Sequence, residues 1–278
     1  MKTLGAVVLA CLFLWGISAR ADQVYMVGDL GPGNTNLYAV NSSNGASELI
    51  GSLGFTQVFT VAFDSQGHLY AIVNGGAGST LGQLATVNLN TGAATLVGSP
   101  AGVPGLFGMA FAGDGTLYAA SFATNDLYSI NLTTGAASLI GSLGFSDVMD
   151  LAWDPFNNTM YAIASIGGKT TDSFIYSMNL MTGEGTLVTT ITGNNCLMGL
   201  TVDSGGRFLA TDFCDSNSPL FQIDLATGAL TDLGDTGINH SMGGTNITPE
   251  PATLLLFGSG LLALSFLGRK RLVREPRV

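Results

Sequence analysis

Three aspartates at the ends of short apolar runs are the first residues in this sequence that suggest chemistry. Asp64, Asp154 and Asp203 each close such a run. Carboxylates brought together can bind divalent cations or act as general acids and bases. Each aspartate also precedes a turn, such as Ser204-Gly-Gly206, in which an aspartate side chain accepts backbone N–H groups. We favour this turn-stabilising interpretation.

Other catalytic and metal-binding patterns are weak or absent. His68 and His240 are the sequence's two histidines and lie far apart along the chain, which argues against a zinc site. Residues 215–218 partly resemble a calcium loop but lack the glycine and the distal glutamate of an EF-hand. There is no nucleophile elbow, zinc-protease motif or phosphate-binding loop. We therefore predict no catalytic residue, no metal ligand and no cofactor; a divalent cation would suit the acidic charge, but no motif supports it.

The elements that must position these residues are internal repeats. A strand-like segment followed by an Asn-Gly or Thr-Gly turn occurs five times. Each copy continues with a short apolar piece, a segment like Val61–Asp64 and a further strand like Leu69–Ala71. The pattern within each unit therefore predicts four short strands in about 45 residues. The turn glycines are Gly45, Gly92, Gly135, Gly183 and Gly228.

A unit of this length and strand number matches one blade of a β-propeller. The units resemble the repeats of NHL-type and YVTN-type propellers, in which the strand equivalent to Val61–Asp64 lies innermost. The resemblance implies an all-β body of five blades of four antiparallel strands, although a diverged sixth blade stays open. Val24–Val27 matches the second strand of a unit and Met242–Thr245 matches the first. The last strand is therefore predicted to complete the first blade, which leaves no open sheet edge.

The propeller resemblance also places one residue from each inner strand around the central channel. Asp150 is the one charged member, and Asp147 and His240 lie in equivalent loops one step outward. A small ligand or cation would bind among Thr60 and these three polar residues. The alternative is that small residues pack tightly at a crowded axis. The aligned residues are Thr60, Gly108, Asp150, Gly199 and Gly243.

The C-terminus carries a three-part pattern. An uncharged apolar run covers residues 252–268, about 26 Å as a helix and at the low end for crossing a membrane. Pro-Glu-Pro precedes it and a basic segment, residues 269–278, follows. Together they resemble the PEP-CTERM sorting signal of Gram-negative bacteria. The resemblance implies that exosortase, a membrane protease, recognises Pro-Glu-Pro and removes the helix, and it associates the protein with exopolysaccharide and biofilm. The signal residues are Pro249, Glu250, Pro251, Arg269, Lys270 and Arg271.

The N-terminus predicts export. Residues 1–21 combine a positive charge, an apolar core and a small-x-small cleavage site, as in a secretory signal peptide. Basic flanks stay in the cytoplasm, so the body should lie outside the inner membrane. We predict a signal peptide (1–21), a propeller (22–247) and a sorting signal (248–278). The protein would be anchored transiently in the inner membrane and then reach the cell surface or extracellular matrix.

The charge of the body limits its partners. Of nineteen acidic residues only Glu250 and Glu275 lie outside it. Of nine basic residues only Lys169 and Arg207 lie inside it, which gives the body a formal charge of −15. Such a surface repels nucleic acid, so we predict no nucleic-acid partner.

Two functional hypotheses follow. In the first, the chain is a non-enzymatic surface or matrix protein whose propeller binds exopolysaccharide, another surface protein or ions. In the second, it is a propeller-type hydrolase or lactonase with a site at the channel mouth, which would need several convergent carboxylates. Because the inner ring offers only Asp150, we favour the first hypothesis.

Two cysteines remain in the mature chain, in an oxidising compartment. Cys196 and Cys214 flank a hairpin whose turn is bounded by Asp203 and Arg207. A regular ladder from this turn places the cysteines directly opposite each other, with Cα atoms ~4.5–5.5 Å apart and within disulfide reach. We predict a structural bond worth roughly 3 kcal/mol in the chain-entropy model; two free thiols are the alternative.

Non-reducing peptide mapping of the exported protein tests this bond. We expect the peptides that contain Cys196 and Cys214 to appear as one cross-linked species that reductant separates. Alkylation of both cysteines before reduction would show that the bond is absent.

Overall fold

The structure, a computed structural model, describes residues 23–29, 33–73, 81–165 and 171–246. The predicted signal peptide and the predicted sorting signal with its helix lie outside the described residues. No helix within these ranges is long and apolar enough to cross a membrane. Contacts divide the chain into two units, Met1–Ile247 and Thr248–Val278. The described residues all belong to the first unit, which is the propeller body.

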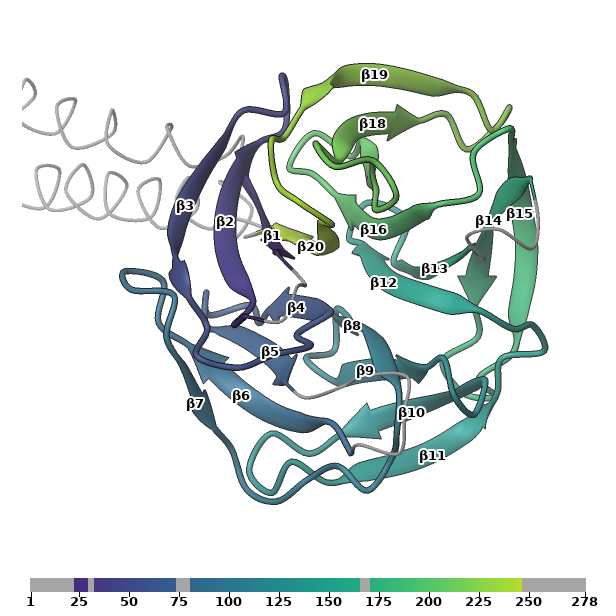
Figure 1. Ribbon diagram of the computed structural model, residues 1–278. Helices are drawn as coiled ribbons and strands as arrows, with labels where there is room; N and C mark the ends of the chain where they lie inside the picture. The colour runs from purple at the N-terminus through teal and green to yellow at the C-terminus, as the bar shows by residue number, and fades with distance from the viewer. Residues whose placement is uncertain (1–22, 30–32, 74–80, 166–170, 247–278) are drawn as a thin grey trace, which may run out of the picture. The chain divides into compact units, whose positions relative to one another are not determined.

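Five antiparallel sheets of four strands surround a common axis as blades (Figure 1). Blade 1 contains β20 (Met242–Asn246), β1 (Gln23–Gly28), β2 (Asn36–Asn41) and β3 (Ser47–Ser52). Blade 2 contains β4 (Thr60–Phe63), β5 (Leu69–Val73), β6 (Gln83–Val87) and β7 (Ala94–Leu96). Blade 3 contains β8 (Leu106–Phe111), β9 (Leu117–Ser121), β10 (Asp126–Ile130) and β11 (Ala137–Ser142). Blade 4 contains β12 (Val148–Asp154), β13 (Thr159–Ser165), β14 (Asp172–Met178) and β15 (Gly185–Thr192). Blade 5 contains β16 (Leu197–Val202), β17 (Phe208–Asp212), β18 (Pro219–Ile223) and β19 (Leu230–Asp235).

Blade 1 is assembled from the two ends of the body. β20 pairs antiparallel with β1, with Val24 opposite Asn246 and Tyr25 opposite Thr245. The predicted all-β propeller of five four-stranded blades is confirmed, and the described residues form no sixth blade. Because β20 supplies the missing innermost strand, each blade has its full set of four strands and the ring has no seam.

Burial decreases from the axis to the rim. Every residue of β4 and β8 is buried, whereas every residue of β3 and β11 is partly or fully exposed. Strands covered on both faces are continuously apolar rather than alternating. Leu106 and Met109 of β8 pack in one cluster with Ile72 of blade 2, so this core lies between neighbouring blades. Burying such a side chain stabilises the fold by ~1.5–3 kcal/mol.

Repeated glycines let neighbouring blades touch backbone to backbone at the rim. Between blades 1 and 2, Gly92 has φ +76°, and a Cβ added to it would lie 2.6 Å from the carbonyl of Gly51. Only glycine fits both the left-handed conformation and this close approach. Beside it, the Ala94 N–H donates to the Leu53 carbonyl at 3.1 Å. Corresponding contacts, which we call the interblade joints, pair Gly98 with Thr134, Gly141 with Gly183, Thr190 with Gly228, and Gly234 with Gly45.

Substitution of a joint glycine should loosen the ring. We expect Gly92→Ala to destabilise the protein because its methyl group would overlap the Gly51 backbone and its φ is left-handed. Urea unfolding, followed by fluorescence of Trp153, measures the loss.

Gly115→Ala is the matched control. Gly115 has nearly the same φ, +81°, but nothing lies within 4 Å of an added Cβ. Gly115→Ala should lower the free energy of unfolding by about 1–2 kcal/mol from backbone strain alone. Gly92→Ala should lower it by about 1–3 kcal/mol more, because its methyl group is also overpacked. Equal losses in the two variants would show that the joint does not require glycine.

Candidate functional site

Asp150 occupies the axis of the propeller, on β12. It is completely buried, as is Thr60. Its two carboxylate oxygens accept hydrogen bonds from the inner strands of four blades: β20, β4, β12 and β16. One side chain therefore ties most of the inner ring together. The donors are the N–H groups of Leu151 (2.9 Å), Leu200 (2.9 Å) and Gly244 (3.1 Å) and the hydroxyl of Thr60 (3.4 Å).

The aligned glycines close the space around this carboxylate. A Cβ on Gly108 would lie 2.7 Å from the Asp150 backbone. A Cβ on Gly243 would lie 2.9 Å from the Phe59 carbonyl oxygen, and one on Gly199 would meet a neighbouring hydroxyl at 2.6 Å. The axis is thus filled by backbone, and Thr60 and Asp150 belong to a packed centre.

Burial also changes the acidity of this group. Desolvation raises the pKa of the Asp150 carboxyl well above its usual range, and the four hydrogen-bond donors oppose this shift only in part. The folded protein therefore holds the proton more tightly than the unfolded chain does. The stability that this group contributes is complete below the unfolded pKa of about 3.9. It is lost as the pH rises through the folded pKa.

Replacement of the carboxyl by an amide should remove this pH dependence. We expect the unfolding free energy of the wild type, minus that of Asp150→Asn, to fall as the pH rises above about 4. The slope should reach at most about 1.4 kcal/mol per pH unit. Thr60→Val keeps the carboxyl and should retain most of the wild-type dependence. Urea unfolding across a pH series measures all three proteins, and parallel curves for wild type and Asp150→Asn would contradict the prediction.

Asp147 and His240 lie at equivalent entrances to inner strands. Both adopt left-handed backbone conformations, with φ +65° and +52°, as do Gln57 and Gly105 at the entrances to β4 and β8. Asp, Asn and His tolerate this region better than most residues, so the backbone itself favours them there. The His240 ring packs 4.7 Å from the ring of Phe213, and its Nδ1 is 2.8 Å from the Phe213 carbonyl oxygen. Asp147 has a different environment.

Asp147 lines a cavity of about 300 Å³ on blade 4. The walls come from the loop between β11 and β12, the end of β13 and the middle of β14. They consist of the aromatic side chains of Phe145, Phe174 and Tyr176, together with Ser146, Asp147 and residues 164–165. We call this cavity the Asp147 pocket. Ligand cavities in proteins begin at about this size and are mostly apolar with a few polar groups.

The aromatic walls are ordered by packing. The rings of Phe145 and Tyr176 are stacked, with centroids 3.8 Å apart and planes 3° from parallel. Phe174 and Tyr176 lie two residues apart on β14, so their side chains share one face of the sheet. The Ser146 hydroxyl is 2.5 Å from the Asp147 carboxylate. The pocket therefore presents one carboxylate against an aromatic surface.

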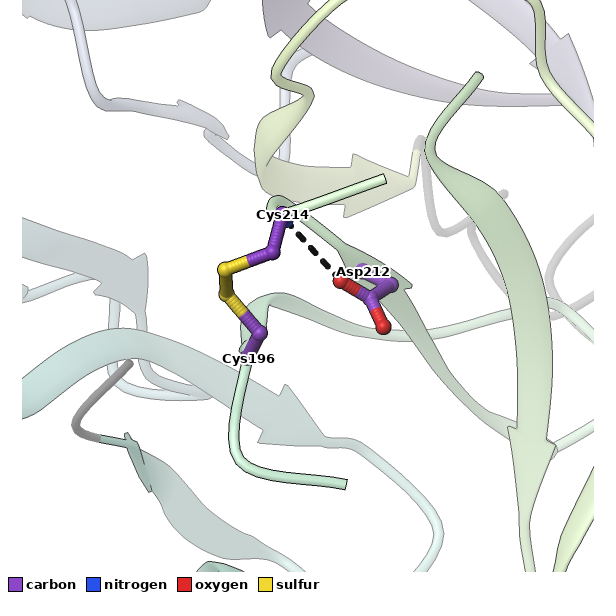
Figure 2. Close-up of side chains that lie close together, drawn as sticks. All are labelled: Cys196, Asp212 and Cys214. Atoms are coloured by element: carbon purple, nitrogen blue, oxygen red, sulfur yellow. Dashed lines mark hydrogen bonds between the residues drawn. A yellow bond between two sulfur atoms is a disulfide. The ribbon is translucent and has the colours of Figure 1, made fainter. Parts of the chain in front are cut away.

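The structure joins Cys196 and Cys214 in a disulfide, with Cα atoms 5.8 Å apart (Figure 2). The predicted register was wrong by one residue. A bulge between Leu197 and Gly199 shifts the β16–β17 ladder, and the Phe213 N–H, not that of Cys214, donates to the Cys196 carbonyl. The bond forms across this offset.

Asp212 lies beside the disulfide, and its Oδ1 accepts the N–H of Cys214 at 2.9 Å (Figure 2). Its other oxygen accepts the Asn194 side-chain amide at 2.9 Å. Within the described ranges, Cys196, Asp212 and Cys214 form the one grouping of three residues spaced as metal ligands. In the oxidised protein both sulfur atoms are used in the bond, so the group serves the loop rather than a metal.

The strand-end aspartates stabilise turns, as expected. Asp64 Oδ1 accepts two backbone N–H groups of its turn, at 2.9 and 2.8 Å. Asp154 Oδ1 accepts the Phe156 N–H at 2.9 Å. Asp203 accepts the Arg207 N–H and pairs with its guanidinium at 2.6 Å. These carboxylates therefore act within three separate hairpins.

Two features of the site region were missed from the sequence. The glycines of the Thr-Gly turns were assigned to turns alone, and their contacts with the neighbouring blade were missed. A second glycine that recurs after the turn, such as Gly51, was the available signal for these contacts. The aromatic pocket was missed because its walls come from separate segments. The signal that was available is the alternation of Phe174 and Tyr176, which puts two rings on one strand face.

Comparison with family models matches two parts of the chain. Residues 11–148 match a repeat of unknown function (DUF6923). Residues 248–271 match the PEP-CTERM protein-sorting motif. The predicted sorting signal is thereby confirmed. No curated protein matches the chain.

Solved structures show similarity to the fold. A chain from the crystal structure of a nidogen/laminin complex is 13% identical, with a TM-score of 0.55 and 83% of each chain covered. A putative 6-phosphogluconolactonase from Bacteroides fragilis is also 13% identical, with a TM-score of 0.48, covering 81% of this chain and 97% of its own. The first similarity concerns the fold alone, and the second supports no conclusion about activity.

Proposed function

We propose that this protein is an exported surface or extracellular-matrix protein whose propeller is a non-catalytic binding module. The observation that carries the proposal is the PEP-CTERM motif at residues 248–271, which implies exosortase as the processing partner and export through the inner membrane. In this proposal residues 252–268 anchor the chain in the inner membrane until exosortase removes them. The basic segment at residues 269–278 holds the tail on the cytoplasmic side.

The binding role is supported by the Asp147 pocket, which combines a carboxylate with aromatic walls. Polysaccharide of the matrix or another surface protein would supply its ligand. The body's charge of −15 favours neutral or cationic partners over anionic ones.

The arrangement of the axis favours binding over the hydrolase alternative. A propeller hydrolase would need convergent carboxylates that face the channel and bind a metal or substrate. Asp150 is the one carboxylate on the aligned inner ring, and donors from the inner strands already occupy both of its oxygens. Asp64, Asp154 and Asp203 bond their own turns.

A charge-removing substitution in the motif tests the processing step. We expect Glu250→Ala to block removal of the tail, so that the protein stays in the membrane fraction with the mass of the uncleaved chain. Mass spectrometry of membrane and extracellular fractions measures this. Glu275→Ala removes the same charge outside the matched motif and should be processed like the wild type. Unchanged tail removal in Glu250→Ala would contradict the proposal.

A further inference from the structure

We propose that the Asp147 pocket binds a small organic cation, in which an ammonium group is carried on an apolar or sugar-like framework. This inference rests on the proposed binding function and names the ligand class for it. Two observations lead to it: the aromatic walls and the single carboxylate.

The aromatic walls suit a cation. Phe145, Phe174 and Tyr176 line one cavity, and because Phe145 and Tyr176 stack on each other, a ligand would contact the free sides of that pair and the ring of Phe174. The face of an aromatic ring carries partial negative charge and attracts an ammonium group within about 6 Å. Stacking of Phe145 on Tyr176 fixes the position of both rings before any ligand arrives, so little conformational entropy is lost on binding.

The charge of the pocket points the same way. Among the described residues that line it, Asp147 is charged and none is basic. Ser146 bonds one oxygen, Oδ2, of this carboxylate. The Ser146 hydroxyl donates a hydrogen bond to the carboxylate but does not neutralise its negative charge. A cation that lies against the rings and beside Oδ1 would neutralise this charge. Because Asp147 is partly buried, the attraction between the cation and the carboxylate is stronger than it would be in water.

Other ligand classes fit less well. Calcium needs six to eight oxygen ligands, whereas this pocket offers one carboxylate and a few hydroxyl groups. Phosphate and acidic sugars would be repelled by Asp147 and by the acidic body. A neutral ring could stack on the walls, but it would leave the carboxylate without a counter-charge.

Choline and 3,3-dimethyl-1-butanol test the charge directly, because they have the same shape and differ in the ammonium nitrogen. In calorimetric titrations of the full-length protein in detergent, we expect choline to bind at least about tenfold more tightly, equivalent to ~1.4 kcal/mol. Glucosamine, with its amine protonated, should likewise bind more tightly than glucose.

Three variants locate the effect. Asp147→Asn keeps the side-chain shape and tolerates the left-handed backbone, and it should abolish the preference for choline over the alcohol. Phe174→Leu should weaken both ligands severalfold. Asp114→Asn removes the same charge from an exposed turn on blade 3 and should leave the titrations unchanged.

Equal affinity for choline and the alcohol in the wild type would overturn the inference, as would a choline preference that survives Asp147→Asn. Binding of neither ligand would overturn it too. These titrations are independent of tail removal in Glu250→Ala, so the proposed export and processing are tested separately. If a glycan array on the same protein found a neutral sugar that competes at this pocket, the binding module would stand and the cationic ligand class would be wrong.

Discussion

Close approach of backbone to backbone at the interblade joints is the constraint on which this ring depends. Each blade can lie flat against the next because the turn glycine of one meets the rim of its neighbour without an intervening side chain. At the axis, Asp150 accepts hydrogen bonds from the inner strands of four of the five blades. The packed apolar layers between blades are therefore held at the rim by the absence of side chains and at the axis by a single buried one.

The sequence was sufficient for the architecture because the determinants of a blade are local. Turn glycines at a regular period and short apolar strands predicted four strands per unit, and the match of Met242–Thr245 to a first strand predicted closure. Register was harder. The β-bulge after Leu197 shifted the pairing of β16 with β17 near the cysteines by one residue. The local sequence pattern does not indicate where a strand carries such an extra residue.

The site was predictable only in part. Alignment of the repeats picked out Thr60 and Asp150 because equivalent positions of a symmetric ring must meet at its axis. Three of the four hydrogen-bond donors to Asp150 lie 50 to 94 positions away in the sequence, so its burial and bonding could not be deduced locally. Asp147 was selected because its loop is equivalent to that of His240, but its aromatic surroundings depend on how this loop lies over β14.

Closure of blade 1 by β20 has a consequence for the timing of export. A chain that crosses a membrane from its N-terminus delivers β1 first and β20 last, so the ring stays open until nearly the whole body has emerged. Until then, β1 exposes an unpaired edge on which another chain could add a strand. The sorting motif begins two residues after β20 ends. If residues 252–268 anchor the chain as we propose, they would keep it at the membrane while this edge is unpaired, and removal of the tail would follow completion of the fold.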